Sequence, residues 1–589
     1  MNKNIKILSL VLVGISQFSF SQIKEERLIL DRKREPEVKK IEKKKTSVES
    51  EKNYPPKEKE QEKVDYKIIN VPAVSDFKTS TIEGEDISPK FNNDSQRNYF
   101  QAGFGNYSKF LADANISYEI DDKTEVGVDL HGLSTNGLTK DFSWNSKRSD
   151  FNAAAFLNSF SDKGKLNITA DWGNHNYNYY GIYALQPSSD VDLKQSYNQL
   201  KINGYYDFFK NNWINDVRFK SSLLTDHFDA KENSGEAQIN FSKYDLPFLA
   251  AEKTKINADL GVKLSTQKST FDLLNQNQSQ YLVTSVKPKV SFYKDNSYLA
   301  IGSDFSFVNS KISDKNTAEA KTNNFRWFPF AEVLFEATEQ YKFYAGIDGG
   351  VQLNSYANLL QQNPFLVSDL VLKPTETKYH FYFGLKGDID QELKYDVKAG
   401  FSDLKNAQFF RANDLFDYNN TLNRSAYNFA NTFSAVYDDG TLSEVKGSLQ
   451  YFPLQNLVID AELHYMKFNL KNLNEVYYKP VLQSTFGAKY SLLDRKLNLG
   501  FKGIFVAERT TNAYQIDVDG VVPNQFTSTE IAKKSLPAYL DLNLNADYKI
   551  NKNFTVFVMG NNLLNKKYEH YLGYKVLGAQ VLGGIRIAF

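Results

Sequence analysis

The chain has 589 residues, 41% hydrophobic and 14% aromatic, with a formal net charge of +1 and no cysteine. The near-neutral charge gives no indication of a nucleic-acid partner, and the lack of cysteine excludes disulfides, thiolate catalysis and cysteine-ligated metals. The mean hydropathy of −0.49 is typical of a soluble protein. A membrane β-barrel gives the same average, because only alternate residues of its strands face lipid.

The N-terminus has the pattern of an export signal. Lys3 and Lys6 precede an apolar run over 7–15, and small residues lead to a predicted cleavage site after Ser21, so 1–21 is predicted to be a signal peptide. The alternative interpretation of the apolar run over 7–15 is a buried N-terminal strand. No later segment approaches the roughly 20 apolar residues that a spanning helix needs, so the mature chain crosses a membrane as a barrel or not at all.

Two segments are expected between the signal and the main domain. Residues 22–66 alternate acidic and basic side chains, with too little apolar surface to offset the entropy of ordering, and are predicted to be a charged, disordered periplasmic spacer. Residues 67–96 begin with an apolar, proline-containing run over 68–74, which predicts an extended segment. This segment is expected below or inside the barrel, or added to the edge of a partner's sheet.

From 97 to 589 the sequence predicts one transmembrane antiparallel β-barrel, an all-β fold. The segments 538–550 and 255–264 each alternate apolar and polar residues over nine or more positions, a length that suits tilted membrane strands better than a soluble sandwich. Short turns, such as 121–123, 162–164 and 551–553, alternate with long connections. Because outer-membrane barrels have short periplasmic turns, the long connections are expected outside the cell. The longer connections are predicted at 177–189, 270–280, 309–323, 353–373, 403–427 and 508–535.

The strand count depends on one ambiguous turn. Asp438-Asp439-Gly440 has the composition of a hairpin turn, and accepting it gives about 23 strands with two short turns in succession. Treating 431–452 as one long strand restores the alternation of turns. We therefore predict about 22 strands, with both chain ends in the periplasm.

The last strand carries a signal of its own. Alternate residues from Leu577 to Phe589 are apolar or glycine, and the chain ends on an aromatic residue. This ending resembles the C-terminal signal by which the insertion machinery recognises outer-membrane proteins. The predicted location is therefore the outer membrane, with its lipid and the insertion machinery as partners.

The segment just before this strand resembles a known family. Asn562, Leu563, Asn565, Lys566 and Tyr568 match an N-L-x-[ND]-K-x-Y pattern common after the penultimate strand of TonB-dependent receptors. The resemblance implies an outer-membrane receptor or transporter of about 22 strands. The family's N-terminal plug of more than about a hundred residues has no room before residue 97, although a barrel of this size is usually plugged. The expected occlusion is by 67–96, by inward-folded loops or by a partner protein.

Three functions follow as hypotheses. The first is transport across the outer membrane without an in-chain plug, with the tail contacting an energy-coupling partner and a plug or lid protein bound in trans. The second is a non-transporting subunit or scaffold of an envelope complex. The third is a barrel hydrolase or metal site using His131, His175 and His227 with Asp129 or Asp226. The alternative is that these histidines have no catalytic role, because strand ends in contact with water tolerate histidine. Motifs for nucleotide binding or hydrolysis are absent from the sequence. The chain is therefore not expected to be an enzyme or to need a cofactor or metal.

One aromatic loop is a candidate contact surface. Tyr177, Tyr179, Tyr180 and Tyr183 lie close together in a predicted extracellular loop, where they are candidates to bind a ligand or partner. The alternative is packing within the loops or an interfacial aromatic girdle, which barrels use in any case.

Overall fold

A computed structural model describes residues 97–138, 145–185, 191–209, 213–246, 254–419, 424–519 and 525–589. The predictions for the signal peptide, the spacer and the 67–96 segment lie outside these residues. Within them, no helix is long and apolar enough to cross a membrane.

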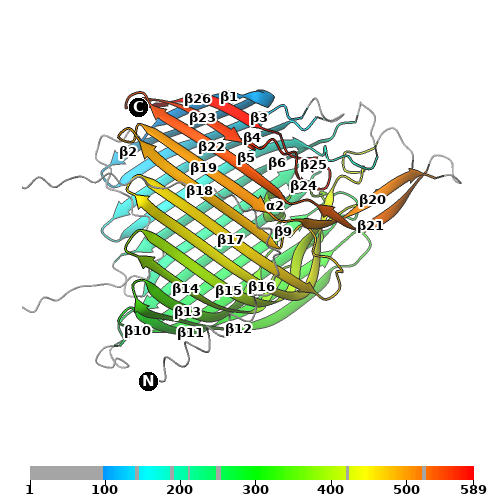
Figure 1. The fold of residues 1–589 in the computed structure, drawn as a ribbon. Helices are drawn as coiled ribbons and strands as arrows, with labels where there is room; N and C mark the ends of the chain where they lie inside the picture. The colour runs from blue at the N-terminus through cyan, green and yellow to red at the C-terminus, as the bar shows by residue number, and fades with distance from the viewer. Residues whose placement is uncertain are drawn as a thin grey trace, which may run out of the picture. The chain divides into compact units, whose positions relative to one another are not determined.

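Twenty-two strands form one closed antiparallel barrel (Figure 1). Each strand from β1 to β19 pairs with the next; β19 then pairs with β22, β22 with β23 and β23 with β26. The ring closes where β26 pairs with β1. The barrel strands are β1 Tyr99–Gly105, β2 Lys109–Asp121, β3 Thr124–Thr135, β4 Arg148–Ser161, β5 Gly164–Asn178, β6 Lys194–Phe208, β7 Ile214–Asp226, β8 Lys231–Lys243, β9 Lys255–Thr270, β10 Gln278–Lys294, β11 Ser297–Ser313, β12 Ala320–Thr338, β13 Tyr341–Gln352, β14 Thr375–Ile389, β15 Leu393–Ala412, β16 Phe433–Leu454, β17 Leu457–Leu470, β18 Leu482–Leu492, β19 Leu497–Val506, β22 Tyr539–Lys549, β23 Phe554–Asn561 and β26 Gln580–Ala588.

The remaining elements lie in the connections. A short turn, η2 Asn106–Ser108, joins β1 to β2, and the helix α2 Tyr356–Gln362 lies between β13 and β14. Two hairpins, β20 Arg509–Val518 with β21 Phe526–Leu536 and β24 Glu569–Tyr571 with β25 Tyr574–Lys575, pair only within themselves.

The predicted strand count is confirmed, and so is the single long strand at the ambiguous turn. β16 runs for 22 residues through Asp438, Asp439 and Gly440. Two expected connections are shorter or more ordered than predicted. β15 continues to Ala412, so the expected 403–427 connection begins about ten residues later, and 508–535 contains the β20–β21 hairpin.

The outer wall is apolar and the inner wall is polar. Phe383, Ile301 and Leu544 point outward with 67%, 51% and 50% of their surface exposed. On the same strand as Leu544, Asp541 faces inward and accepts a hydrogen bond from Tyr568 at 2.6 Å. A band of exposed large apolar side chains around a closed sheet indicates a hydrocarbon environment, in which no backbone amide is left unpaired.

The seam between the first and last strands is packed from inside. Phe557, with 2% of its surface exposed, lies over Gly103 and Gly584, where an added Cβ would meet its ring at 3.1 and 2.4 Å. Leu111 and Leu582 complete this small apolar cluster. Glycine is needed at these two positions because the ring occupies the space that a side chain would take.

The two ends of the barrel differ as expected. The short turns, including 121–123, 162–164 and 551–553, all join barrel strands at one end, and the backbone N–H of Phe589 bonds the Asn98 carbonyl at the same end, at 2.9 Å. The long connections gather at the other end, where α2 and both hairpins lie (Figure 1).

Candidate functional site

Three long loops meet over the mouth of the barrel. Their described residues are 179–185 with 191–193, 353–374 and 562–579, and the loops are attached to the ring at positions roughly a third of its circumference apart. The Tyr179 hydroxyl donates to the Leu366 carbonyl at 2.7 Å, and the Phe365 ring stacks on Tyr574 with centroids 3.5 Å apart. Loops from such distant strands can touch only by crossing the opening, so together they form a layer that we call the lid.

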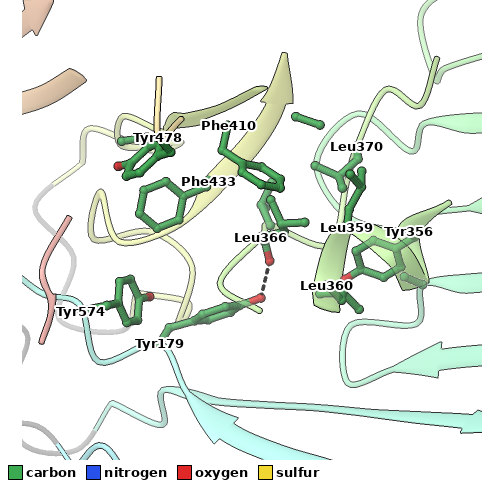
Figure 2. Packing of buried hydrophobic residues seen from close by; sticks show 14 of the residues in the cluster. Tyr179, Tyr356, Leu359, Leu360, Leu366, Leu370, Phe410, Phe433, Tyr478 and Tyr574 are labelled. Carbon is green, nitrogen blue, oxygen red and sulfur yellow. Dashed lines mark hydrogen bonds between the residues drawn. The ribbon is translucent and has the colours of Figure 1, made fainter. Parts of the chain in front are cut away.

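The lid shares one hydrophobic core with neighbouring strand ends and loops (Figure 2). Tyr179 and Tyr356 are fully buried, and Tyr574 and Phe433 are 1% exposed. Figure 2 shows Tyr179, Tyr574, Phe433 and Tyr478 approaching from one side and the α2 leucines from the other. Packing at this density makes the loops a folded unit, since burying each large aromatic side chain stabilises it by about 1.5–3 kcal/mol.

Helix α2 forms because its sequence provides both ends and an apolar face. The Ser355 hydroxyl caps the helix by accepting from the Asn358 N–H at 3.1 Å. Tyr356, Leu359 and Leu360 follow at helical spacing and are buried. Pro364 stops the helix because the residue before a proline avoids helical backbone angles.

Two carboxylates of the barrel wall hold this loop. Glu232, at the start of β8, accepts from the backbone N–H groups of Tyr356 at 2.6 Å and Ala357 at 3.0 Å. Asp226, at the end of β7, accepts from the Tyr356 hydroxyl at 2.8 Å and the Ser368 hydroxyl at 2.5 Å. Because these four hydrogen bonds join wall residues to loop residues, they attach the lid to one side of the barrel wall. Shielding from water strengthens each bond between a carboxylate and a neutral donor.

The family-like motif shapes the loop after β23. Asn562 and Asn565 adopt left-handed backbone angles, with φ of 47° and 51°, which asparagine tolerates better than most residues. The Asn562 side chain donates to the carbonyls of Lys566 at 2.7 Å and Leu577 at 2.8 Å, which joins the two arms of the loop. The Leu563 and Lys566 side chains are exposed.

The last residue of the motif lies in an aromatic group at the edge of the lid. Tyr568 stacks on Tyr539 with centroids 3.7 Å apart, and His570 lies edge-on to both rings. Arg509 reaches this group and donates to the Glu569 and His570 carbonyls. His570 is exposed at the surface, but partial desolvation by these groups, and then the positive charge of Arg509, lower its pKa to about 4, while Asp541 acts in the opposite direction.

The four tyrosines of the aromatic loop fall into two environments. Tyr177 and Tyr179 are buried in the lid core, with hydroxyls on the Pro364 and Leu366 carbonyls at 2.5 and 2.7 Å. Tyr180 and Tyr183 are partly buried. This is the placement that loop packing predicts, and ligand binding by the two partly exposed tyrosines stays a prediction.

A polar cavity of about 860 Å³ lies beneath the lid. Ser355, Asn358 and Gln361 line it from the α2 side. Strands β6 to β11 and β13 to β16 supply its walls, mostly with lysine, carboxylate, amide and hydroxyl groups. A second cavity of about 440 Å³, which shares Lys446 with the first, lies against β13 and β15 to β18. These volumes are typical of sites for small solutes.

The candidate histidines do not meet in one site. His131 bonds Asp113, His175 bonds Asp150 at 2.8 Å, and the His227 ring contacts Phe228. Within the described ranges, no three histidine, aspartate or glutamate side chains are arranged to hold a metal ion.

The sequence does not identify the residues that hold the lid. In the sequence Asp226 is a candidate only as a histidine partner, and neither Glu232 nor Phe365 belongs to a motif. The alternation of residues along β8 does predict that the side chain of Glu232 faces the inside of the barrel. Its contacts with Tyr356, which is 124 residues away, follow only from the closed ring.

Comparison with known proteins identifies the fold. No family model and no curated protein matches the sequence. Among solved structures, the ferric-catecholate import receptor Fiu from E. coli K12 aligns with a TM-score of 0.60 and 12% identity, over 84% of this chain and 82% of that one. The FrpB iron transporter from Neisseria meningitidis aligns with a TM-score of 0.59 and 11% identity, over 84% and 82%. The pyoverdine outer membrane receptor FpvA from Pseudomonas aeruginosa PAO1 gives 0.57 and 13%, over 84% and 79%.

These neighbours are TonB-dependent receptors, so the resemblance expected from the C-terminal motif is confirmed at the level of the fold. The described part of the chain is a 22-stranded barrel, and its likeness to these structures is a likeness of fold.

Proposed function

We propose that this protein is an outer-membrane transport barrel in which the lid controls access from outside to the polar cavity. The observation that carries the proposal is the convergence of three distant loops above a cavity of about 860 Å³. A scaffold needs neither a solute-sized polar cavity nor a folded layer that separates it from the exterior. The structural likeness to import receptors supports the same reading.

The proposal includes location and partners. The protein would be exported through the general secretory pathway and inserted with both termini in the periplasm, with the 22–66 spacer free to contact an energy-coupling partner. The 67–96 segment, or a plug or lid protein supplied in trans, would add to the occlusion that the lid provides.

Solute flux in reconstituted vesicles tests the proposal. We compare entry of small solutes through the wild type, a variant lacking 22–96 and a variant in which 354–373 is replaced by a short Gly-Ser linker. Transport predicts that removing either occluding element increases entry. Absence of flux in all three proteins, together with stoichiometric co-purification of envelope proteins from native membranes, would instead establish a scaffold.

A further inference from the structure

The charged groups that line the larger cavity are unequally paired. Each of its four carboxylates has a basic partner, which is a lysine for Glu236, Asp304 and Glu444 and the imidazole ring of His380 for Asp348. These pairs are Glu236 with Lys263 at 2.7 Å, Asp304 with Lys287 at 2.8 Å, Glu444 with Lys446 at 2.9 Å, and Asp348 with His380 at 3.2 Å. Three of the four acidic side chains of the lining are therefore neutralised locally by lysine.

Two lysines of the lining have no such partner. Lys201 on β6 and Lys220 on β7 lie on neighbouring strands, where they face Ser222 and Asn203 across the pair. Among the described residues, neither lysine has an ion-pair partner within 4.0 Å. Asp171 on β5 is the cross-strand neighbour of Lys201 without forming an ion pair. Glu236 faces Lys220, but it binds Lys263 instead.

Apart from Asp171 and Glu236 on the flanking strands, the groups around these lysines are neutral hydrogen-bonding groups. Gln199 donates to the Ser222 hydroxyl at 2.8 Å, and Asn203 and Ser234 also line this part of the cavity. Amides and hydroxyls of this kind bind hydroxyl or oxyanion groups of a solute without adding charge. The β6–β7 wall therefore offers two cations amid neutral donors and acceptors.

We propose that the cavity beneath the lid binds a small, hydroxylated organic anion, whose negative groups contact Lys201 and Lys220. Two lysines on adjacent strands suit a solute with two anionic groups, and the volume of about 860 Å³ accommodates a molecule of that size. As an assignment of the transported substrate class, this inference rests on the proposed transport function.

Binding to the purified full chain in detergent tests the site directly. Isothermal titration is carried out at low salt with citrate, pyrophosphate and glucose as probes. The wild type is expected to bind citrate or pyrophosphate and not glucose, and the preferred probe shows whether the anionic group is a carboxylate or a phosphate. The double variant Lys201→Gln/Lys220→Gln is expected to bind at least about tenfold more weakly, and Lys201→Arg/Lys220→Arg is expected to retain binding.

A matched control removes the same charge elsewhere. Lys489 on β18 and Lys502 on β19 alternate with outward apolar residues and do not line the cavity, so Lys489→Gln/Lys502→Gln is expected to bind like the wild type. Equal weakening in both double variants, equal binding of glucose, or no anion binding by the wild type would overturn the inference.

Solute flux into vesicles distinguishes the proposed anion site from the proposed transport function. Vesicles that pass solutes with no anion preference and no effect of the Lys201 and Lys220 changes would contradict the anion site and leave transport standing. Lysine-dependent anion binding without any flux would contradict transport and leave the site standing.

Discussion

The hydroxyl of Tyr179 donates to the backbone carbonyl of Leu366, 187 residues further along the chain and on a loop from a distant part of the ring. Gln195 donates to the same hydroxyl at 2.9 Å, so both atoms of this link are buried and hydrogen-bonded. The bond joins two walls of the barrel through its lid.

Changing Tyr179→Phe should loosen the lid without removing its packing. The buried Leu366 carbonyl loses its donor, which costs about 1–3 kcal/mol. Hydrogen exchange of the α2 amides, followed by mass spectrometry, should be correspondingly faster. Tyr180→Phe is the control, because that hydroxyl bonds the Lys575 carbonyl at 3.0 Å in an exposed position. Equal effects of the two changes would show that the Tyr179 bond has no special role.

Changing Glu232→Gln should release α2 from the wall. An amide offers one acceptor oxygen in place of two. Because the N–H groups of Tyr356 and Ala357 bond different oxygens of Glu232, the N–H₂ group of the glutamine would face one of them. Buried donors left without a partner cost about 1–3 kcal/mol each. Protease accessibility of the 353–374 loop measures the release. Glu236→Gln changes the same strand but not a lid contact, so it should leave the loop protected; if it exposes the loop equally, the attachment is not specific to Glu232.

Changing Asp438→Ala should free the loop after β17. The carboxylate accepts from the Asn472 and Leu473 N–H groups, both at 2.8 Å, and from the Asn472 side chain at 2.7 Å. Loss of these bonds predicts faster tryptic cleavage after Lys471. Asp403→Ala removes only an exposed ion pair with Lys378 and should change little. Unchanged cleavage of the Asp438 variant would contradict this role.

Acid should weaken the part of the lid around His570. Its pKa is about 4 in the closed lid and near 6.5 once it separates from Arg509 and the aromatic rings, so it is neutral in both states above pH 7. As the pH falls from about 6.5 towards 4, the open state binds a proton that the closed state does not, and the closed state loses stability. Exchange of amides in 562–579 should therefore speed up between pH 7 and 5, after correction for intrinsic rates, and less so in His570→Gln. The same pH response in both proteins would exclude His570 as its source.

Changing Phe557→Ala should weaken the barrel seam. The ring fills the space over Gly103 and Gly584, and its loss leaves a cavity that costs about 3–5 kcal/mol. The temperature at which the folded barrel unfolds on an SDS gel should fall. Phe554→Ala on the same strand removes an outward ring that is 46% exposed, and it should have a smaller effect. A larger shift for Phe554 would contradict the assignment of the two faces.

The barrel was predictable because its signal repeats along the chain. Alternation in segments such as 538–550 fixes which residues face outward, and the alternation of turn lengths corrected the misleading Asp438-Asp439-Gly440 composition. The physical reason for that composition is now visible. Asp438 bonds the loop after β17. Asp439 accepts from the Asn406 N–H at 3.0 Å, at the point where β15 has an irregularity in its pairing with β16.

The lid was not predictable to the same degree. Inward-folded loops were one of three expected occluding elements, but the contacts that build the lid join residues such as Tyr179 and Asn431, which are 252 positions apart. No local pattern specifies such pairs. The burial of Tyr177 and Tyr179 also follows from long-range packing, which a cluster of tyrosines in the sequence does not reveal.

The central claim is that folded loops close the outer mouth of the barrel, and single-channel recording in planar bilayers tests it most directly. The account predicts a quiet wild type with rare openings, and a steady current several-fold larger when 354–373 is replaced by a short Gly-Ser linker. A wild type as conductive as the linker variant would contradict the account, and so would a linker variant that folds and inserts but stays silent.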